Sequence, residues 1–452
     1  MLRSASILIL DFTVAAIKRR GFGVFSKVLI IGAGTGGLCL AQGLKQAGVD
    51  VSVFERDRTP TDRLQGYRLH ISASGARALE HCLPATLFGE FLVSVAKPNR
   101  AVTFLDSNLK TLLTFPIVAD PNAESRELPV SRITLRKLLL QGLEGVVNFE
   151  KRFHHYEQRP DGRVVAHFED GSIVEGDVLI GADGASSTIR AQLLPYARRI
   201  DTGIVAISGK APLNDYVRRL TPPQFFQGPT LVLGPGGKFL FGSAVEFPSN
   251  GDNKSADPQV VSSPSDDLLF GERAEYVMWG LSCRRGLLPE LADAKEGNGD
   301  ELMKVSLRVT TGWHASLRAL IEATAPETIN AFQVKSSERI APWNTEPITL
   351  LGDAIHNMTP YRGMGANMAL LDADALRLAL LKVHRGESDL IPALHVYEAA
   401  MIDRGFRAVE ASLKQMKQVH SEGRFANAMR ALSLRTIDRL PVHLKKAIMQ
   451  YR

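Results

Sequence analysis

The sequence predicts an α/β protein in which three α/β segments are separated by two β-rich insertions and followed by a helical segment. Three stretches carry this prediction, because each places a glycine turn directly after an apolar run that suits a strand buried on both faces. They are KVLIIGAGTGGLCL from Lys27, DVLIGADGASSTIR from Asp177 and ITLLGDAIHNMTPYRGMGANMAL from Ile348. A buried strand followed by a turn and a helix is the repeating unit of a parallel sheet.

The first unit, Lys27 to Asp57, reads as strand, glycine turn, helix and second strand. Gly32, Gly34 and Gly37 form G-x-G-x-x-G, which supplies a tight turn, close approach of the backbone to a ligand and close helix packing. A phosphate would lie at the positive N-terminus of the helix. Glu55 ends the second strand, where an acidic side chain accepts hydrogen bonds from a ribose. The unit therefore predicts a Rossmann-like dinucleotide site, against the alternative of a tight turn that binds nothing.

The segments between these units read as strands and loops. AVTFLDSNLKTLLTFP, from Ala101, resembles two strands about a Ser107–Asn108 turn, and the polar stretch Pro248 to Asp267 reads as a mobile loop. The expected division has an N-terminal extension, a dinucleotide-binding domain in three parts, two insertions and a C-terminal helical segment. The extension is 1–26, and the dinucleotide-binding domain comprises 27–100, 125–201 and 332–385. The insertions are 101–124 and 202–331, and the helical segment is 386–452.

The charge and the cysteines of the chain limit its partners. The net charge is +6, and the segment from Asp403 to Arg452 holds eleven Lys or Arg against four Asp or Glu. No aromatic-rich basic strand and no zinc pattern accompanies that segment, so we expect a solvated helical face and no nucleic-acid partner. The three cysteines are widely spaced without a C-x-x-C pair, which favours a reducing, cytoplasmic location and no metal centre.

The first 26 residues are basic at both ends and apolar between, but Asp11 interrupts the apolar run. The run is too short for a membrane span. A targeting peptide, an interfacial helix and a dispensable extension remain alternatives. We favour the dispensable extension, so that membrane contact through residues 1–26 is the less favoured reading.

Taken together and in this order, the three glycine stretches resemble the group A flavoprotein monooxygenases, the para-hydroxybenzoate hydroxylase-like family, from Lys27 to Arg377. The resemblance implies an FAD-binding domain and a β-rich substrate domain formed by the insertions. It also implies NADPH or NADH as a transient cosubstrate, and no second G-x-G-x-x-G motif is present for a resident nicotinamide cofactor.

The resemblance implies cofactor roles for particular residues. The glycines of the first motif, Glu55 and Arg56 would hold the ADP half of FAD. Arg136, in the R-x-x-x-R helix that begins at Arg132, would reach the diphosphate or ribityl region; alternatively it is a solvated helix arginine. Asp183 and Gly184 would lie near the pyrophosphate, although the pair could also be an ordinary turn.

The third stretch would hold the flavin itself. Asp353 would accept hydrogen bonds from ribityl hydroxyls, and Pro360 would lie beside the reactive face of the ring. Gly363 and Gly365 would let the backbone approach, and the amides of Ala366 and Asn367 would face the ring edge that becomes negative on reduction. The chain departs from the family at Ile355, where a small residue is usual, which puts the local packing in doubt.

The implied reaction uses NAD(P)H and O2 to hydroxylate or epoxidise a hydrophobic, aromatic or polycyclic small molecule through a flavin C4a-hydroperoxide. By analogy with the family, the catalytic candidates near the substrate are His70, Tyr67, Arg68 and Arg362, together with Pro360. His70 lies in an alternating strand, where a histidine is more often structural. His356 is expected to orient its loop.

Three alternatives keep part of this pattern. A flavin-dependent halogenase would need W-x-W-x-I-P, whereas Trp279, Trp313 and Trp343 each stand alone. A cyclase that uses FAD only as a scaffold would carry the same motifs, and the sequence does not separate it from an oxygenase. A binding or membrane-interaction protein would leave three flavin motifs without a catalytic role.

Overall fold

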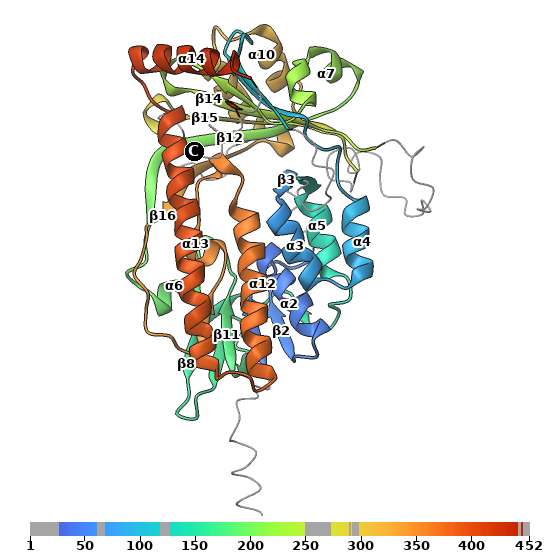
Figure 1. Ribbon diagram of the computed structural model, residues 1–452, viewed down its shortest axis with the longest axis vertical. Helices are drawn as coiled ribbons and strands as arrows, with labels where there is room; N and C mark the ends of the chain where they lie inside the picture. The colour runs from blue at the N-terminus through green and yellow to red at the C-terminus, as the bar shows by residue number, and fades with distance from the viewer. Residues whose placement is uncertain are drawn as a thin grey trace, which may run out of the picture.

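The computed structural model describes residues 27–60, 68–117, 127–248, 273–288, 291, 298–441 and 444–445. The expectations for residues 1–26 and for Tyr67 therefore lie outside the described residues, as does the expected loop at Pro248 to Asp267 except for its first residue. The described chain forms two layered units, one with β11, α2 and α12, the other with β12, β14 and β15 (Figure 1).

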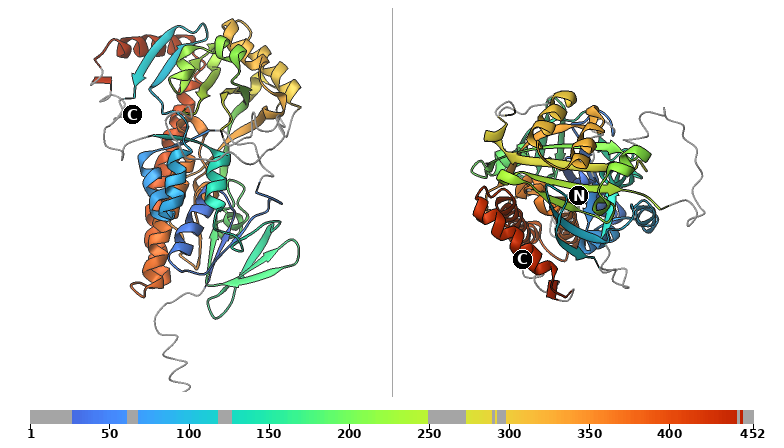
Figure 2. Two further views of the ribbon diagram at one scale, coloured as in Figure 1. Left: turned by 90° about the vertical axis from the view of Figure 1, so that its right-hand side faces the viewer. Right: turned by 90° about the horizontal axis from the view of Figure 1, so that it is seen from above.

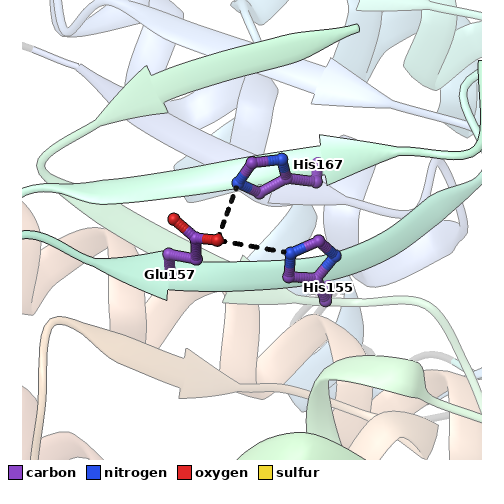
Figure 3. A group of neighbouring side chains, drawn as sticks. All are labelled: His155, Glu157 and His167. Carbon is purple, nitrogen blue, oxygen red and sulfur yellow. Dashed lines mark ion pairs between the residues drawn. The ribbon is translucent and has the colours of Figure 1, made fainter. Parts of the chain in front are cut away.

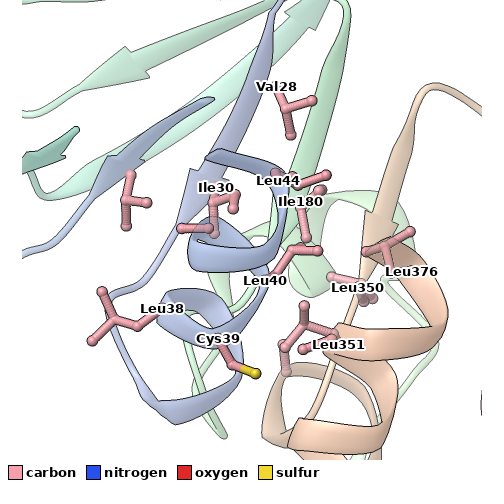
Figure 4. Close-up of a cluster of buried hydrophobic side chains, with 14 of the residues drawn as sticks. Val28, Ile30, Leu38, Cys39, Leu40, Leu44, Ile180, Leu350, Leu351 and Leu376 are labelled. Carbon is pink, nitrogen blue, oxygen red and sulfur yellow. The ribbon is translucent and has the colours of Figure 1, made fainter. Parts of the chain in front are cut away.

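The first unit is built on a five-stranded, wholly parallel sheet in the order β17-β11-β1-β2-β7. Its strands are β1 (Val28–Ile31), β2 (Val51–Phe54), β7 (Val147–Asn148), β11 (Val178–Gly181) and β17 (Ile348–Leu350). Every residue of β1, β11 and β17 is buried, as the continuous apolar runs predicted. Figure 4 shows their side chains meeting those of α2 and α12 in one core.

Helices cover this sheet and connect its strands. They are α2 (Thr35–Gln46), α3 (Ala73–Cys82), α4 (Ala85–Val93), α5 (Arg132–Leu140), α6 (Thr188–Leu193), α11 (Asp353–His356), α12 (Gly365–His384) and α13 (Leu390–Val419). The helix α12 packs against α2, α3 and α13. Two small sheets complete the unit, β3 (Arg68–Ile71) with β6 (Leu128–Ser131), and β8 (Phe153–Gln158), β9 (Val164–Phe168) and β10 (Ile173–Gly176).

The second unit is a seven-stranded sheet in the order β16-β12-β15-β14-β13-β4-β5. Its strands are β4 (Ala101–Asp106), β5 (Thr111–Pro116), β12 (Arg199–Pro212), β13 (Thr230–Leu233), β14 (Phe239–Val245), β15 (Tyr276–Arg284) and β16 (Asn330–Ser337). Both insertions thus share one sheet, joined where β13 pairs with β4. Its strands β12 and β16 cross the divisions expected at 201/202 and 331/332.

Short helices flank the seven-stranded sheet, and two later helices approach it. The flanking α-helices are α7 (Asp215–Leu220), α9 (Gly299–Val309) and α10 (Ala315–Glu322), and the flanking 3-10 helices are η2 (Pro223–Phe226), η3 (Pro235–Gly237), η4 (Arg285–Leu287) and η6 (Pro326–Thr328). The long helix α13 runs beside α12 toward this sheet, and α14 (Arg424–Asp438) packs on β5 (Figures 1 and 2). Within the described ranges, no helix combines the length and apolar character that crossing a membrane requires.

Candidate active site

The glycine turn after β1 behaves as its motif predicts. Gly32 has φ +111°, and a Cβ there would lie 2.3 Å from the carbonyl oxygen of Ala182. A Cβ on Gly37 would lie 2.1 Å from the carbonyl oxygen of Gly32. By contrast, a Cβ on Gly34 would meet no protein atom within 4 Å. Two glycines are therefore required by the packing of the protein, whereas the third leaves open space at the start of α2.

Acidic and basic side chains surround that open space. Glu55 is 9% exposed, and its Oε2 accepts a hydrogen bond from the amide of Ala33 over 2.7 Å. Arg136 projects from α5, and its two terminal nitrogens each lie 3.2 Å from Oδ2 of Asp57. Asp57 was not predicted as a site residue, although it stands two residues after Glu55. The sequence gives no signal that its partner would be Arg136, which lies 79 residues further along the chain.

A cavity of about 380 Å3 opens at these residues. It is lined by the turns after β1 and β11, by the end of β2, by α5 and by the ends of β8 and β9. The charged residues that line it are Glu55, Arg56, Asp57, Arg132, Arg136, Lys137, Lys151, Arg152, Glu169 and Asp183. Six of these ten are Lys or Arg, a balance that suits a phosphate-bearing ligand.

The turn after β11 holds an acidic residue with one spare oxygen. Oδ2 of Asp183 accepts hydrogen bonds from the amides of Thr188, at 2.7 Å, and Ile189, at 3.4 Å, at the start of α6. Its Oδ1 is buried and has no hydrogen-bond partner within the described part of the chain. Burial raises the pKa of Asp183 above its usual value. Gly184 follows with φ +78°. The spare oxygen of Asp183, on a cavity-lining residue, can accept a hydrogen bond from a ligand.

A buried ionic network holds the turn after β17. Oδ2 of Asp372, in α12, accepts from the amide of Gly352 at 2.9 Å and lies 2.5 Å from Nε2 of His356; Oδ1 accepts from Arg404 at 2.8 Å. Burial opposes the charged imidazolium, but the Asp372 carboxylate outweighs it and raises the pKa of His356. Ile355, the departure from the family, is 1% exposed and packs in the core. The network thus fixes the backbone from which Asp353 projects.

The start of α12 faces the carboxylate of Asp353. The Asp353 side chain is exposed, and a Cβ on Gly365 would lie 3.8 Å from its Oδ1. Gly363 has φ +61° and joins η7 (Pro360–Arg362) to the helix. The first amides of a helix, here including Ala366 and Asn367, have no intrahelical partner. Pro360 and Arg362 are exposed at the same turn.

The side chain of Asn367 has a role that the sequence did not reveal. It is fully buried, its Oδ1 accepts from the amide of Ser72 at 2.8 Å, and its Nδ2 donates to the carbonyl of His70 at 2.7 Å. Asn367 therefore ties the helix α12 to the strand β3 across 297 residues of sequence. Only its backbone amide was expected to matter, so the side chain adds a second reason for asparagine here.

The two candidates on β3 point to different neighbours. The Nε2 of His70 lies 3.4 Å from Oε1 of Glu127, and the His70 side chain is 30% exposed. Arg68 donates to Oγ of Ser243 at 2.7 Å and to Oδ1 of Asn99 at 2.5 Å. Burial lowers the pKa of Arg68 to about 10. Arg68 thus connects the first unit to β14 of the seven-stranded sheet.

A buried hydrogen-bond network lies next to Pro360 and was not predicted. The hydroxyl of Tyr361 donates to Oγ of Ser282 at 3.0 Å and lies 2.6 Å from Nε2 of His420. Nδ1 of His420 lies 2.6 Å from the carbonyl oxygen of Gly237. That carbonyl can only accept, so Nδ1 of His420 carries a proton. Burial raises the pKa of Tyr361 far above its usual range.

Known proteins are similar to this chain in sequence and in architecture. A family model described as an FAD binding domain matches residues 26–75 and 293–412. The FAD-dependent monooxygenase dbaB of Emericella nidulans is 31% identical over 373 residues, which cover 77% of this chain and 85% of that protein. The structure of HpxO from Klebsiella pneumoniae, complexed with FAD and uric acid, has a TM-score of 0.71 at 26% identity, covering 91% of this chain and 92% of that one.

A further relative is much longer than this chain. The dual O-methyltransferase/FAD-dependent monooxygenase CTB3 of Cercospora beticola is 33% identical over 398 residues, which are 84% of this chain but 45% of that protein. Likewise, the matches to the next two curated relatives span 39% and 45% of their lengths. The chain belongs to the FAD-dependent monooxygenase family, and the resemblance to group A flavoprotein monooxygenases is confirmed.

The residues present fit FAD. Gly34 leaves open space where a ligand can approach the protein backbone, and six of the ten charged residues that line the cavity are basic. Asp183 keeps a buried acceptor without a protein partner among the described residues. The family model and the FAD-complexed relative assign FAD as the cofactor of this site.

Proposed function

We propose that this chain is an oxygenase that consumes NADPH or NADH and O2 and acts on a hydrophobic, aromatic or polycyclic small molecule. One oxygen atom would enter the substrate and the other would leave as water, while the nicotinamide is oxidised. The observation that carries the proposal is the meeting of three glycine turns. The neighbouring parallel strands β1, β11 and β17 end at Ile31, Gly181 and Leu350, so that the turns that follow them share one edge of the sheet.

Residues of this chain would bind and orient the cofactor, while FAD supplies the redox chemistry when bound. The turn at Gly34 and the basic lining of the cavity would hold the diphosphate. Asp353 would accept from ribityl hydroxyls, and the free amides at the start of α12 would stabilise negative charge on the ring. The buried His356–Asp372–Arg404 network keeps both groups in place.

The substrate class is supported by the face of the seven-stranded sheet that meets η7. Phe239 packs near Tyr361, with ring centroids 5.7 Å apart, and Phe104, Phe115 and Phe241 belong to the same cluster. Such rings favour flat apolar molecules. Arg68, beside Ser243, would add one cation for a phenolate or carboxylate on the substrate.

Two groups are candidates for handling a substrate proton. His70 remains a candidate general base, with Glu127 beside it. The Tyr361 hydroxyl, held by His420, is the second candidate and immediately follows Pro360. Proton transfer to a positioned side chain is the usual way to activate a phenol for attack on an electrophilic oxygen.

The decisive test is reduction of the FAD-loaded protein by NADPH and by NADH in a stopped-flow instrument, with and without a panel of aromatic and polycyclic compounds and urate. We expect reduction by one nicotinamide, accelerated by some member of the panel, with product formation once O2 is admitted. If FAD binds but neither nicotinamide reduces it under any condition, the oxygenase proposal is wrong and FAD acts as a scaffold.

A further inference from the structure

A group of potential metal ligands lies on the small sheet formed by β8, β9 and β10, outside the residues that line the FAD cavity. It consists of His155 and Glu157 on β8 and His167 on β9. The pairing register of the two strands shifts between Phe153 and His155. Phe153 and Tyr156 consequently pack toward the core of the first unit, while His155 and Glu157 share the opposite face with His167.

The three side chains converge on one point (Figure 3). Nε2 of His155 lies 3.6 Å and Nε2 of His167 lies 3.7 Å from the same oxygen, Oε1 of Glu157. The two imidazole rings are a cross-strand pair, stacked with centroids 4.3 Å apart and planes 8° from parallel. All three ligand atoms lie within 4.8 Å of one another. Ligand atoms around a tetrahedral zinc ion are about 3.3 Å apart, so the set would close if side-chain rotation tilted the two stacked rings toward a common ion.

One of these nitrogens lacks a partner in the protein. Nε2 of His167 is buried from solvent and has no hydrogen bond within the described ranges, because 3.7 Å to Glu157 is too long for one. Buried polar atoms are normally satisfied. A cation between His167, His155 and Glu157 would satisfy it, and the 62% exposure of the Glu157 side chain leaves a route for the ion.

His154 supports the ligand role of its neighbour. Nδ1 of His154 lies 2.8 Å from Nδ1 of His155, with the rings nearly perpendicular. A metal on Nε2 of His155 requires the proton of that ring to be on Nδ1, and Nδ1 of His154 is placed to accept it. Metal-bound histidines are usually oriented by such a hydrogen bond from the second ring nitrogen.

We propose that His155, Glu157 and His167 bind a divalent transition-metal ion of the Zn2+ class, which links β8 to β9. Two imidazoles and one carboxylate are ligands that Zn2+, Ni2+ and Cu2+ accept, whereas Mg2+ prefers oxygen alone. Three protein ligands leave a position for water. The site is separate from the redox site, because none of its ligands lines the FAD cavity.

Calorimetric titration of Zn2+ into the FAD-loaded, untagged protein tests the proposal. We expect one ion per chain at this site, and a loss of affinity of about tenfold or more in His155→Gln, Glu157→Gln and His167→Gln. The matched control is His81→Gln, since His81 pairs with a single carboxylate, Asp374, at 2.9 Å and belongs to no such group of ligands among the described residues. Mg2+ should not bind at this site. The control should bind Zn2+ as the wild type does.

Electron paramagnetic resonance of bound Cu2+ gives an independent count of the ligands. We expect nitrogen couplings from two imidazoles in the wild type and in His81→Gln, and from one in His155→Gln or His167→Gln. The proposal is overturned if Zn2+ does not bind, if it binds with unchanged affinity in the three ligand variants, or if the copper spectrum does not respond to them. In that case the group is only a pair of His–Glu contacts.

Discussion

The two ends of the FAD site are built in different ways. At the end that holds the cavity, backbone turns form the site, and nearby carbonyl oxygens leave no room for a Cβ at Gly32 and Gly37. At the end proposed to hold the flavin ring, called here the flavin end, the site depends on buried side chains from distant segments, as in the Asp372, Asn367 and Tyr361 networks. A backbone turn is encoded by adjacent residues, whereas a side-chain network depends on the whole fold.

This difference predicts that the largest loss of stability comes from the flavin end. Asp372→Ala would leave His356, Arg404 and the Gly352 amide without their shared acceptor. Breaking a buried ion pair from one side costs about 3–5 kcal/mol. Urea denaturation should show a loss of that size, whereas Asp50→Ala, at an exposed position outside the helices, should change stability by less than about 0.5 kcal/mol. A loss below about 1 kcal/mol for Asp372→Ala would contradict the role of the network.

The next effect depends on pH and concerns Glu398 of α13. Burial raises the pKa of Glu398 to about 7, and its Oε2 accepts from Thr345 at 2.7 Å. The folded-state pKa exceeds the unfolded one, so the wild type should lose stability as the pH rises from about 4.5 to 7, by up to about 3 kcal/mol. Glu398→Gln should remove this loss and be the more stable protein at pH 8. If the free energy of unfolding changes with pH in the same way for the two proteins between pH 5 and 8, Glu398 is not a buried, protonated group.

Asp353→Ala should separate ligand binding from folding. The Asp353 side chain is exposed, and no described residue forms a hydrogen bond with it. The free energy of unfolding of the apoprotein should therefore stay within about 0.5 kcal/mol of the wild-type value. If ribityl hydroxyls donate to its carboxylate, FAD affinity should fall by about 1.5–3 kcal/mol. Titration of FAD into the two apoproteins measures this difference. Equal affinity and equal turnover would remove Asp353 from the site.

The smallest effect is expected for Tyr361→Phe, which keeps the ring packed near Phe239 but removes the hydroxyl between Ser282 and His420. The stability loss should be about 1 kcal/mol, the net contribution of a typical hydrogen bond. If Tyr361 holds a substrate proton, product formation should fall while flavin reduction is unchanged. Unchanged product formation would leave His70 as the remaining candidate.

The contrast between the two ends also explains what the sequence could predict. The strands β1, β11 and β17 and their turns follow from apolar runs and glycines within a few residues, and the α/β fold with its FAD-binding domain was predicted from them. Arg68 bonding Ser243 joins residues 175 positions apart, and Tyr361 meets His420 across 59. No local pattern encodes such pairs, because they form only when the two units pack together.

The central claim, that the turn at Gly34 is shaped for FAD and not for packing, is tested most directly by titrating FAD into apoprotein with valine at that position. Gly34 and Gly89 both have open space where a Cβ would be and a backbone without positive φ, but only Gly34 lines the cavity. We predict one FAD per chain for the wild type and for Gly89→Val, and a loss of affinity of at least about tenfold, or about 1.4 kcal/mol, for Gly34→Val with folding intact. FAD binding to Gly34→Val as tight as to the wild type would contradict the account.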